Sequence, residues 1–217
     1  MLIINLIGFI IACIALIASG GFLVKSLSRI SKFLRISEFS AAFIIMAIAT
    51  SLPELFVGIS SAMSNNSALS LGNVIGANIL NLTLITGIIV LMGKEIKTKK
   101  MGKESYFMLL GLALIIILYS IGKSLSRIDG IILLAFFAIN LYTVFKKREK
   151  PPKKTKKRDG KNNFKFLFIF LISLIILFIS SNYVVKYASG LALDLNLSQI
   201  IIGLFLISIA TTLPELT

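Results

Sequence analysis

Seven long apolar runs restrict the fold of this 217-residue chain more than any other feature. They cover residues 2–24, 39–63, 68–92, 105–121, 128–145, 164–187 and 197 to the end. A helix crosses the bilayer core with about 20 apolar residues, and each run approaches or exceeds that length. Because backbone groups in lipid must be bonded internally, we predict an all-α polytopic membrane protein with about seven transmembrane helices.

The net charge of +14 has a simpler explanation than nucleic-acid binding. All of the 23 basic residues except Lys123, Arg127 and Lys186 lie in the loops after spans one, three and five or at their edges. The positive-inside rule places these loops in the cytoplasm and the N-terminus outside. We therefore expect the lipid bilayer, and no nucleic acid, as the partner of this chain; the sequence indicates no oligomeric state.

Residues 146–163 divide the chain into two membrane parts, 1–145 and 164–217. This segment is rich in lysine and contains Pro151 and Pro152, a composition typical of a solvated linker. Contact of its basic residues with anionic lipid headgroups is the alternative. No targeting peptide is recognisable before the first span, which favours a prokaryotic plasma membrane over that of an organelle.

One segment of the chain occurs twice. ATSLPEL at Ala49–Leu55 and ATTLPEL at Ala210–Leu216 lie 161 residues apart and agree at six of seven positions. They fall in spans two and seven, which cross the membrane in opposite directions. An inverted repeat of this kind is typical of secondary transporters, whose substrate sites lie near the bilayer midplane where two related, broken helices meet.

Of the nine acidic residues, only Glu54 and Glu215 lie within spans. A carboxylate at the bilayer centre costs about 2.5–3.5 kcal/mol even on a lenient scale, so each requires a cation, a proton or a hydrogen-bond donor. Neither helix contains a basic residue as counter-ion. We predict a cation site built around both glutamates; protonated acids that only hold helices together are the alternative.

The neighbours of the two glutamates supply further oxygen. Hydroxyl groups precede each glutamate by three or four residues, at Thr50, Ser51, Thr211 and Thr212. Pro53 and Pro214 have no N–H, so they distort the helix and free backbone carbonyls to face an ion. Hydroxyls also often bond back to their own helix, which is the structural alternative. Hard oxygen ligands suit calcium and sodium.

The third span adds carboxamides. Asn73, Ala77 and Asn81 share one helical face, and the glycines of GNVIGANILN permit close helix contact, so the asparagines are ligands or packing contacts. The chain has no histidine and one isolated cysteine, Cys13. This argues against a transition-metal site and against histidine-dependent catalysis. We predict a non-enzymatic protein without a cofactor.

The segments ATSLPE, GNVIGANILN and ATTLPE resemble the signature helices of the cation/calcium exchanger superfamily, specifically its sodium/calcium exchanger branch. The resemblance covers essentially the whole chain in span order and repeat placement. It implies a fold of two inverted five-helix repeats, the second incomplete here. It also implies exchange of Ca²⁺ for Na⁺ by alternating access, as spans one and six move across a fixed central bundle.

The same resemblance implies roles for individual residues. Glu54 and Glu215 would bind both ions at the midplane, with hydroxyl, amide or carbonyl oxygens from Thr50, Thr211, Ser51, Thr212, Asn81, Ala47 and Ser208. This chain departs from the pattern at Ala77, where the family has a serine that contributes to a sodium site. Ala49 and Ala210 replace glycines of the family.

The chain ends at Thr217, inside the second signature helix. The repeat offset places the end of a complete second repeat at about residue 306. We therefore expect a C-terminal truncation; a pseudogene product or a half completed by another subunit are the alternatives. Three functions stay open: sodium-coupled calcium antiport, proton-coupled calcium or cation antiport, and a non-transporting membrane subunit. Coupling ion, stoichiometry and potassium dependence are not indicated.

Overall fold

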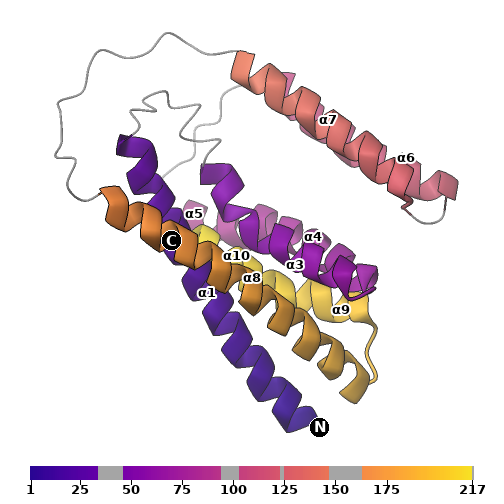
Figure 1. Ribbon diagram of the computed structural model, residues 1–217. Coiled ribbons are helices and arrows are strands. Elements are labelled where there is room, and N and C mark those ends of the chain that lie inside the picture. Colours follow the sequence, from indigo (N-terminus) through magenta and orange to yellow (C-terminus); the bar gives the residue numbers. More distant parts are fainter. Residues whose placement is uncertain (34–45, 94–102, 123–124, 147–162, 217) are drawn as a thin grey trace. The chain divides into compact units, whose positions relative to one another are not determined.

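A computed structural model describes residues 1–33, 46–93, 103–122, 125–146 and 163–216 (Figure 1). The start of the second predicted span, most of the predicted linker and the Glu215 side chain lie outside the described residues. All regular structure within the described ranges is helical, which confirms the predicted all-α class. The helices form two compact units, Met1–Lys94 with Lys153–Thr217 and Glu95–Pro152, and we treat each by itself.

The first unit combines two long helices with several divided ones. The long helices are α1 (Leu2–Phe33) and α8 (Asn163–Asp194). The third span consists of α4 (Ser67–Leu80), the π-helical turn η1 (Asn81–Ile85) and α5 (Thr86–Met92). The remaining pieces are α3 (Leu52–Met63), α9 (Gln199–Ile202), the π-helical turn η3 (Gly203–Ile207), α10 (Ser208–Thr212) and the 3₁₀ turn η4 (Leu213–Leu216).

The turns after α3 and α8 have the same construction. Asn65 and Asn196 adopt left-handed backbone angles, with φ of 53° and 54°. The N–H of the next residue then bonds back to the helix, from Asn66 to the Ser61 carbonyl at 2.8 Å and from Leu197 to the Ala192 carbonyl at 2.9 Å. This is the Schellman arrangement, which asparagine tolerates better than other residues except glycine. Each turn lets the following helix reverse direction.

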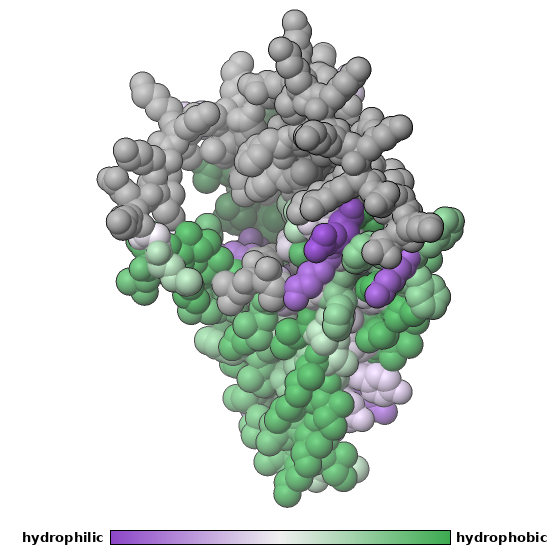
Figure 2. All heavy atoms as spheres, turned by 90° about the vertical axis from the view of Figure 1, so that its left-hand side faces the viewer, coloured by the Kyte–Doolittle hydropathy of each residue, from purple (hydrophilic) through white to green (hydrophobic). Residues whose placement is uncertain are grey.

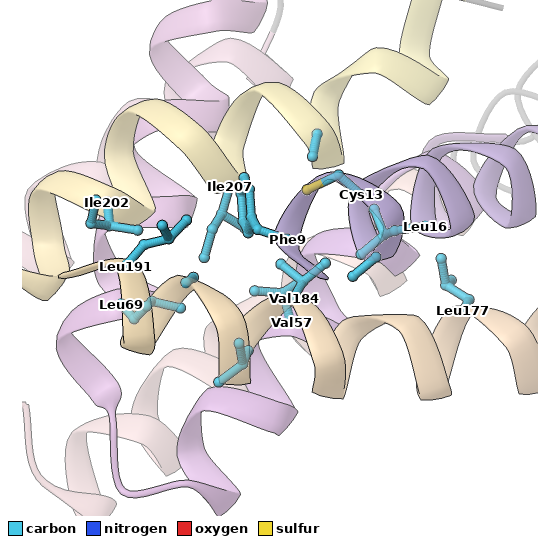
Figure 3. Packing of buried hydrophobic residues seen from close by; sticks show 14 of the residues in the cluster. Phe9, Cys13, Leu16, Val57, Leu69, Leu177, Val184, Leu191, Ile202 and Ile207 are labelled. Carbon is cyan, nitrogen blue, oxygen red and sulfur yellow. The ribbon is translucent and has the colours of Figure 1, made fainter. Parts of the chain in front are cut away.

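The core of the first unit forms where α1 packs along α8 (Figure 3). Leu16 of α1 and Leu177 and Val184 of α8 are fully buried in this contact. At one end Asn5 Nδ2 donates to Asp194 Oδ2 at 2.7 Å. The long contact and this polar tie hold α1 and α8 together as a pair.

Glycines allow the backbones of α4 and the seventh span to touch. A Cβ atom on Gly72 would collide with the Ile200 carbonyl, and one on Gly76 with the Leu204 carbonyl. From the other side, a Cβ on Gly203 would collide with the Leu69 carbonyl and lie 3.0 Å from the backbone nitrogen of Asn73. Small residues at helix contacts are typical of membrane proteins, where close van der Waals packing drives association. This contact joins the first repeat to the second.

The second unit is a pair of helices, α6 (Lys103–Gly122) and α7 (Arg127–Lys146). Phe107 and Phe136 pack between them with ring centroids 6.2 Å apart. Ser126 caps α7: its N–H and hydroxyl both donate to Asp129 Oδ2 at 2.7 Å. The cap satisfies donors at the helix start that have no partner within the helix.

The described surface suits a membrane. Many large apolar side chains are exposed on α1, α4 and α8. Figure 2 shows apolar residues over most of the coloured part of one face. By length and composition, three described helices could cross a bilayer: Leu2–Ile30, Ser67–Met92 and Phe164–Asp194. Three shorter apolar helices accompany them, Leu52–Met63, Leu109–Gly122 and Gln199–Thr212. Their positions agree with the first, third and sixth predicted spans and with parts of the second, fourth and seventh.

Two helices extend beyond the apolar runs that were predicted as spans. The sixth span was predicted to end at residue 187, with Lys186 in the following loop, but α8 continues to Asp194 and contains Lys186. The first span was predicted to end at residue 24, yet α1 contains Lys25 and Arg29. Hydropathy marks where the apolar stretch ends, whereas a helix continues into the headgroup region because long basic side chains reach water from within it.

We predict that Gly76→Ala destabilises the protein by about 1–3 kcal/mol, because the added methyl group has no room against the Leu204 carbonyl. Gly87→Ala is the matched control, since a Cβ at Gly87 meets nothing within 4 Å. Thermal unfolding of the purified natural protein in detergent measures the difference. Equal midpoints for the two variants would contradict the close contact between α4 and η3.

Candidate cation-binding site

Both repeated segments contain a helix distortion next to proline, as predicted. Residues 46–50 are helical, Ser51 forms a turn, and α3 begins at Leu52 with Pro53 in its first turn. In the second copy, α10 ends at Thr212 and the 3₁₀ turn η4 begins at Leu213. Because proline removes one N–H from the helix ladder, each segment changes geometry at the same point of the repeat.

Glu54 lies in the first turn of α3, and both of its carboxylate oxygens are buried from solvent. A buried carboxylate in a membrane protein is stabilised by a cation, a proton or hydrogen-bond donors. The start of a helix also favours negative charge because its first N–H groups point toward the residue. The position therefore suits a carboxylate that exchanges between bound cations.

The two proline segments meet at one point of α1. A Cβ atom on Gly20 would lie 2.9 Å from Pro214 Cγ and 3.4 Å from Pro53 Cγ. Pro53 and Pro214 are both buried there. Since each proline directly precedes a predicted glutamate ligand, this contact brings the two Pro-Glu turns to the same region of the bundle. The position of the Glu215 carboxylate itself lies outside the described side chains.

The predicted ligands of the first repeat bond to their own helix. Thr50 Oγ1 and Ser51 Oγ each donate to the Ala47 carbonyl at 3.1 Å, and the Ser51 N–H reaches the same oxygen at 3.2 Å. The hydroxyl protons are thereby turned away, so the lone pairs of both hydroxyl oxygens stay open. The Ala47 carbonyl, in contrast, must give up some of these bonds before it can bind an ion.

The predicted ligands of the second repeat are more deeply buried. Ser208, Thr211 and Thr212 have almost no exposed surface. The Ser208 hydroxyl donates to the Leu204 carbonyl. Thr212 Oγ1 is buried and makes no hydrogen bond with the described residues. A buried hydroxyl without a partner is costly unless something else binds it, and a cation is one such partner.

Asn81 occupies the first position of the π-helical turn η1, and its Oδ1 is buried without a hydrogen bond to any described residue. Asn78, one turn earlier on an exposed face, donates to its own helix at the Val74 carbonyl, 2.8 Å away. Ala77 is buried on the same side as Asn73. The Asn81 oxygen is thus buried, whereas the Asn78 side chain is exposed and bonded to its own helix.

The sequence left Asn73 open as a ligand or a packing contact, and the predicted ligand set omits it, yet it touches a member of that set. Asn73 is completely buried, and its Oδ1 accepts a hydrogen bond from Thr211 Oγ1 at 3.1 Å. The signal in the sequence was its position on the face shared with Ala77 and Asn81. Three asparagines within nine residues look alike in sequence, so burial alone separates them.

The candidate oxygen donors that the structure describes are mostly neutral. Within the described part of the chain, no three or more His, Cys, Asp or Glu side chains gather into a metal-binding group. Beside the Glu54 carboxylate, the described candidate donors are the amide, hydroxyl and carbonyl oxygens named above. Calcium and sodium accept such mixed oxygen sets.

Comparison with known proteins gives a consistent result. Residues 4–146 and 165–217 match the family model described as sodium/calcium exchanger protein. An uncharacterised membrane protein of Methanocaldococcus jannaschii is 30% identical over 100% of this chain and 71% of its own length. The inner membrane protein YrbG of Escherichia coli is 30% identical over 95% of this chain and 67% of its own length.

Solved structures of the sodium-calcium exchanger NCX_Mj are also similar to this chain. One of them, soaked with 2.5 mM Na⁺ and 10 mM Sr²⁺, matches with a TM-score of 0.58 and 28% identity. The match covers 100% of this chain and 71% of that one. The sodium/calcium exchanger MaX1 of Methanosarcina acetivorans is 34% identical over 50% of this chain and 31% of its own length.

We predict that Gly20→Ala weakens cation binding, because the added methyl group lies 2.9 Å from Pro214 Cγ and pushes the second proline turn away from α1. Gly21→Ala is the control, since a Cβ at the adjacent Gly21 meets nothing within 4 Å. The measurement is the rise in unfolding midpoint on adding calcium. A rise in Gly20→Ala as large as in Gly21→Ala would show that the site tolerates the displacement.

Proposed function

The chain belongs to the sodium/calcium exchanger protein family, and we propose that it forms the ion site of an antiporter that exchanges Ca²⁺ for Na⁺ across a membrane. The family is one of transporters and not of enzymes, and the chain is an integral membrane protein. Two similar proteins, MaX1 and NCX_Mj, carry the name sodium/calcium exchanger.

The observation that carries the proposal is the buried carboxylate of Glu54 beside the meeting point of the two proline turns. Glu54 and Glu215 are the proposed acidic ligands. Two carboxylates balance one divalent ion or two monovalent ions, so release of calcium leaves a charge that sodium must neutralise. Charge balance then enforces exchange over free diffusion.

The remaining proposed ligands are neutral oxygens that flank the two glutamates. Hydroxyl oxygens come from both repeats, a carboxamide oxygen from the third span, and backbone carbonyls from the residues before the hydroxyls: Thr50, Ser51, Thr211, Thr212, Asn81, Ala47 and Ser208. The buried and unpartnered oxygens of Asn81 and Thr212 support their inclusion. Six to eight oxygens are typical for calcium, and fewer suffice for sodium.

Alternating access is the proposed mode of transport. The long contact between α1 and α8 supports joint movement of these two helices past the divided helices that carry the ligands. We further propose the N-terminus outside, a cytoplasmic basic segment at 146–163, and a first repeat of residues 1–145. The proposed location is a prokaryotic plasma membrane, and the second repeat begins at residue 164.

One observation favours a second candidate, proton-coupled exchange of calcium or another cation. Ala77 is buried on α4 at a position where the family pattern has a serine that contributes to a sodium site. Without that hydroxyl, one sodium position loses an oxygen. Protons could then neutralise the glutamates in place of sodium, because a carboxylate in a membrane is readily protonated.

We predict that Glu54→Gln lowers sodium-driven calcium uptake about a hundredfold, the equivalent of about 2.7 kcal/mol, because a carboxamide cannot balance the charge of calcium. The assay uses the purified protein in sodium-loaded liposomes. Glu104→Gln is the matched control, since Glu104 lies in the first turn of α6, in the other compact unit.

Two outcomes would change the proposal. Calcium uptake driven by a proton gradient without sodium would favour the second candidate. An equal loss of uptake in both glutamine variants would show that Glu54 has no special role.

We predict that Ala77→Ser lowers the sodium concentration for half-maximal exchange by about fivefold, the equivalent of about 1 kcal/mol, because it restores a hydroxyl on a buried face. Ala68→Ser on the exposed face of α4 is the control and leaves the sodium dependence unchanged. The measurement is calcium uptake at a series of internal sodium concentrations. An unchanged value for Ala77→Ser would mean that residue 77 does not face a sodium position.

A further inference from the structure

Asn73 of α4 is a fully buried polar side chain to which the proposed ligand set assigns no role. Its Oδ1 accepts a hydrogen bond from Thr211 Oγ1 at 3.1 Å, across 138 residues of sequence. The same Thr211 hydroxyl lies 3.2 Å from the Ser208 carbonyl oxygen. Thr211 and Ser208 are both proposed ligands, so Asn73 contacts the site through one of its members.

A single proton determines what Thr211 and Ser208 can offer to a cation. A hydroxyl has one proton and two lone pairs, so a strong hydrogen bond to Asn73 weakens the bond to the Ser208 carbonyl. When Asn73 accepts the proton, that carbonyl is free to bind a cation. The Thr211 oxygen then presents its lone pairs on the side away from Asn73.

The first repeat shows the contrasting arrangement. Thr50 and Ser51 both donate their hydroxyl protons to the carbonyl of Ala47, within their own helix. Among the described residues, these two hydroxyls make no hydrogen bond to a side chain of another helix. The Ala47 carbonyl therefore accepts both hydroxyl protons, whereas the Ser208 carbonyl shares the Thr211 proton with Asn73.

The packing around Asn73 fixes the backbone from which its side chain projects. Gly72 and Gly76 bring the backbone of α4 against the seventh span, and a Cβ on Gly203 would lie 3.0 Å from the Asn73 backbone nitrogen. Asn73 Nδ2 is buried and has no hydrogen-bond partner among the described residues. An N–H donor repels a cation, and Oδ1 is already bonded to Thr211, so Asn73 acts through Thr211 and is not itself a ligand.

We propose that Asn73 is a positioning residue for the second-repeat half of the cation site, an inference that rests on the function proposed above. By accepting the Thr211 proton, Asn73 orients the lone pairs of Thr211 toward the ion and releases the Ser208 carbonyl to bind it. Asn73 thereby couples the third span of the first repeat to the signature helix of the second.

The test compares three variants of the protein in sodium-loaded liposomes. Asn73→Ala removes the acceptor without adding bulk, and Asn73→Asp keeps an acceptor oxygen at the same place. Asn78→Ala, on the exposed face of the same helix, is the matched control. Calcium uptake is measured over a range of external calcium, so that the KM for calcium and the maximal rate per folded molecule are obtained separately.

We expect Asn73→Ala to raise the KM for calcium about tenfold while the maximal rate changes less than about twofold. Asn73→Asp should stay within about threefold of the original KM, and Asn78→Ala should equal it. A purely structural role would lower the amount of folded protein and leave the KM unchanged. An unchanged KM in folded Asn73→Ala therefore overturns the inference.

The Asn73→Asp variant provides a second test in case Asn73→Ala does not fold. If folded Asn73→Asp has a KM raised as far as that expected for Asn73→Ala, the acceptor role is wrong, whether or not Asn73→Ala folds.

The experiment also distinguishes failure of the proposed function from failure of this inference. Absence of sodium-driven uptake by the unaltered protein overturns the proposed function and this inference with it, whereas normal uptake with an unchanged KM in Asn73→Ala overturns the inference alone.

Discussion

The contact between α4 and the π-helical turn η3 is the interaction on which the candidate site depends. Gly72, Gly76 and Gly203 remove the side chains that would keep the two backbones apart. In lipid there is little hydrophobic force between helices, so close van der Waals contact and buried hydrogen bonds must hold them. The approach is close enough for Asn73 to reach Thr211, which links a helix of the first repeat to the signature segment of the second.

A second close approach completes the arrangement. At Gly20, α1 receives the rings of Pro53 and Pro214 from the two repeated segments. Proline disturbs the helix, and irregular backbone inside a membrane is tolerated only where protein or a polar cavity covers it. The long helix α1 provides that cover, because it packs along α8 and presents a residue without a side chain where the prolines meet. Distorted backbone and its polar groups are thus gathered inside the bundle.

The two copies of the repeated segment are nearly identical in sequence but differ in their hydrogen bonds. Thr50 and Ser51 bond to a carbonyl of their own helix, whereas Thr211 also bonds to a neighbouring helix and Thr212 has no partner among the described residues. Neighbouring elements cause the difference, since only the second copy lies against Asn73. An inverted repeat can therefore contain two half-sites with unequal oxygen donors.

Sequence by itself determined the membrane class and the helical fold, because hydropathy is a property of single segments. It also predicted the inverted repeat and Glu54 as a ligand. The apolar run ends near Lys186 but α8 continues to Asp194, since apolar length does not report where a helix stops in the headgroup region. Only the tertiary structure separated Asn73 from Asn78 and Asn81. Their burial depends on which helix packs against each face of α4. The sequence of α4 alone does not show which helix that will be.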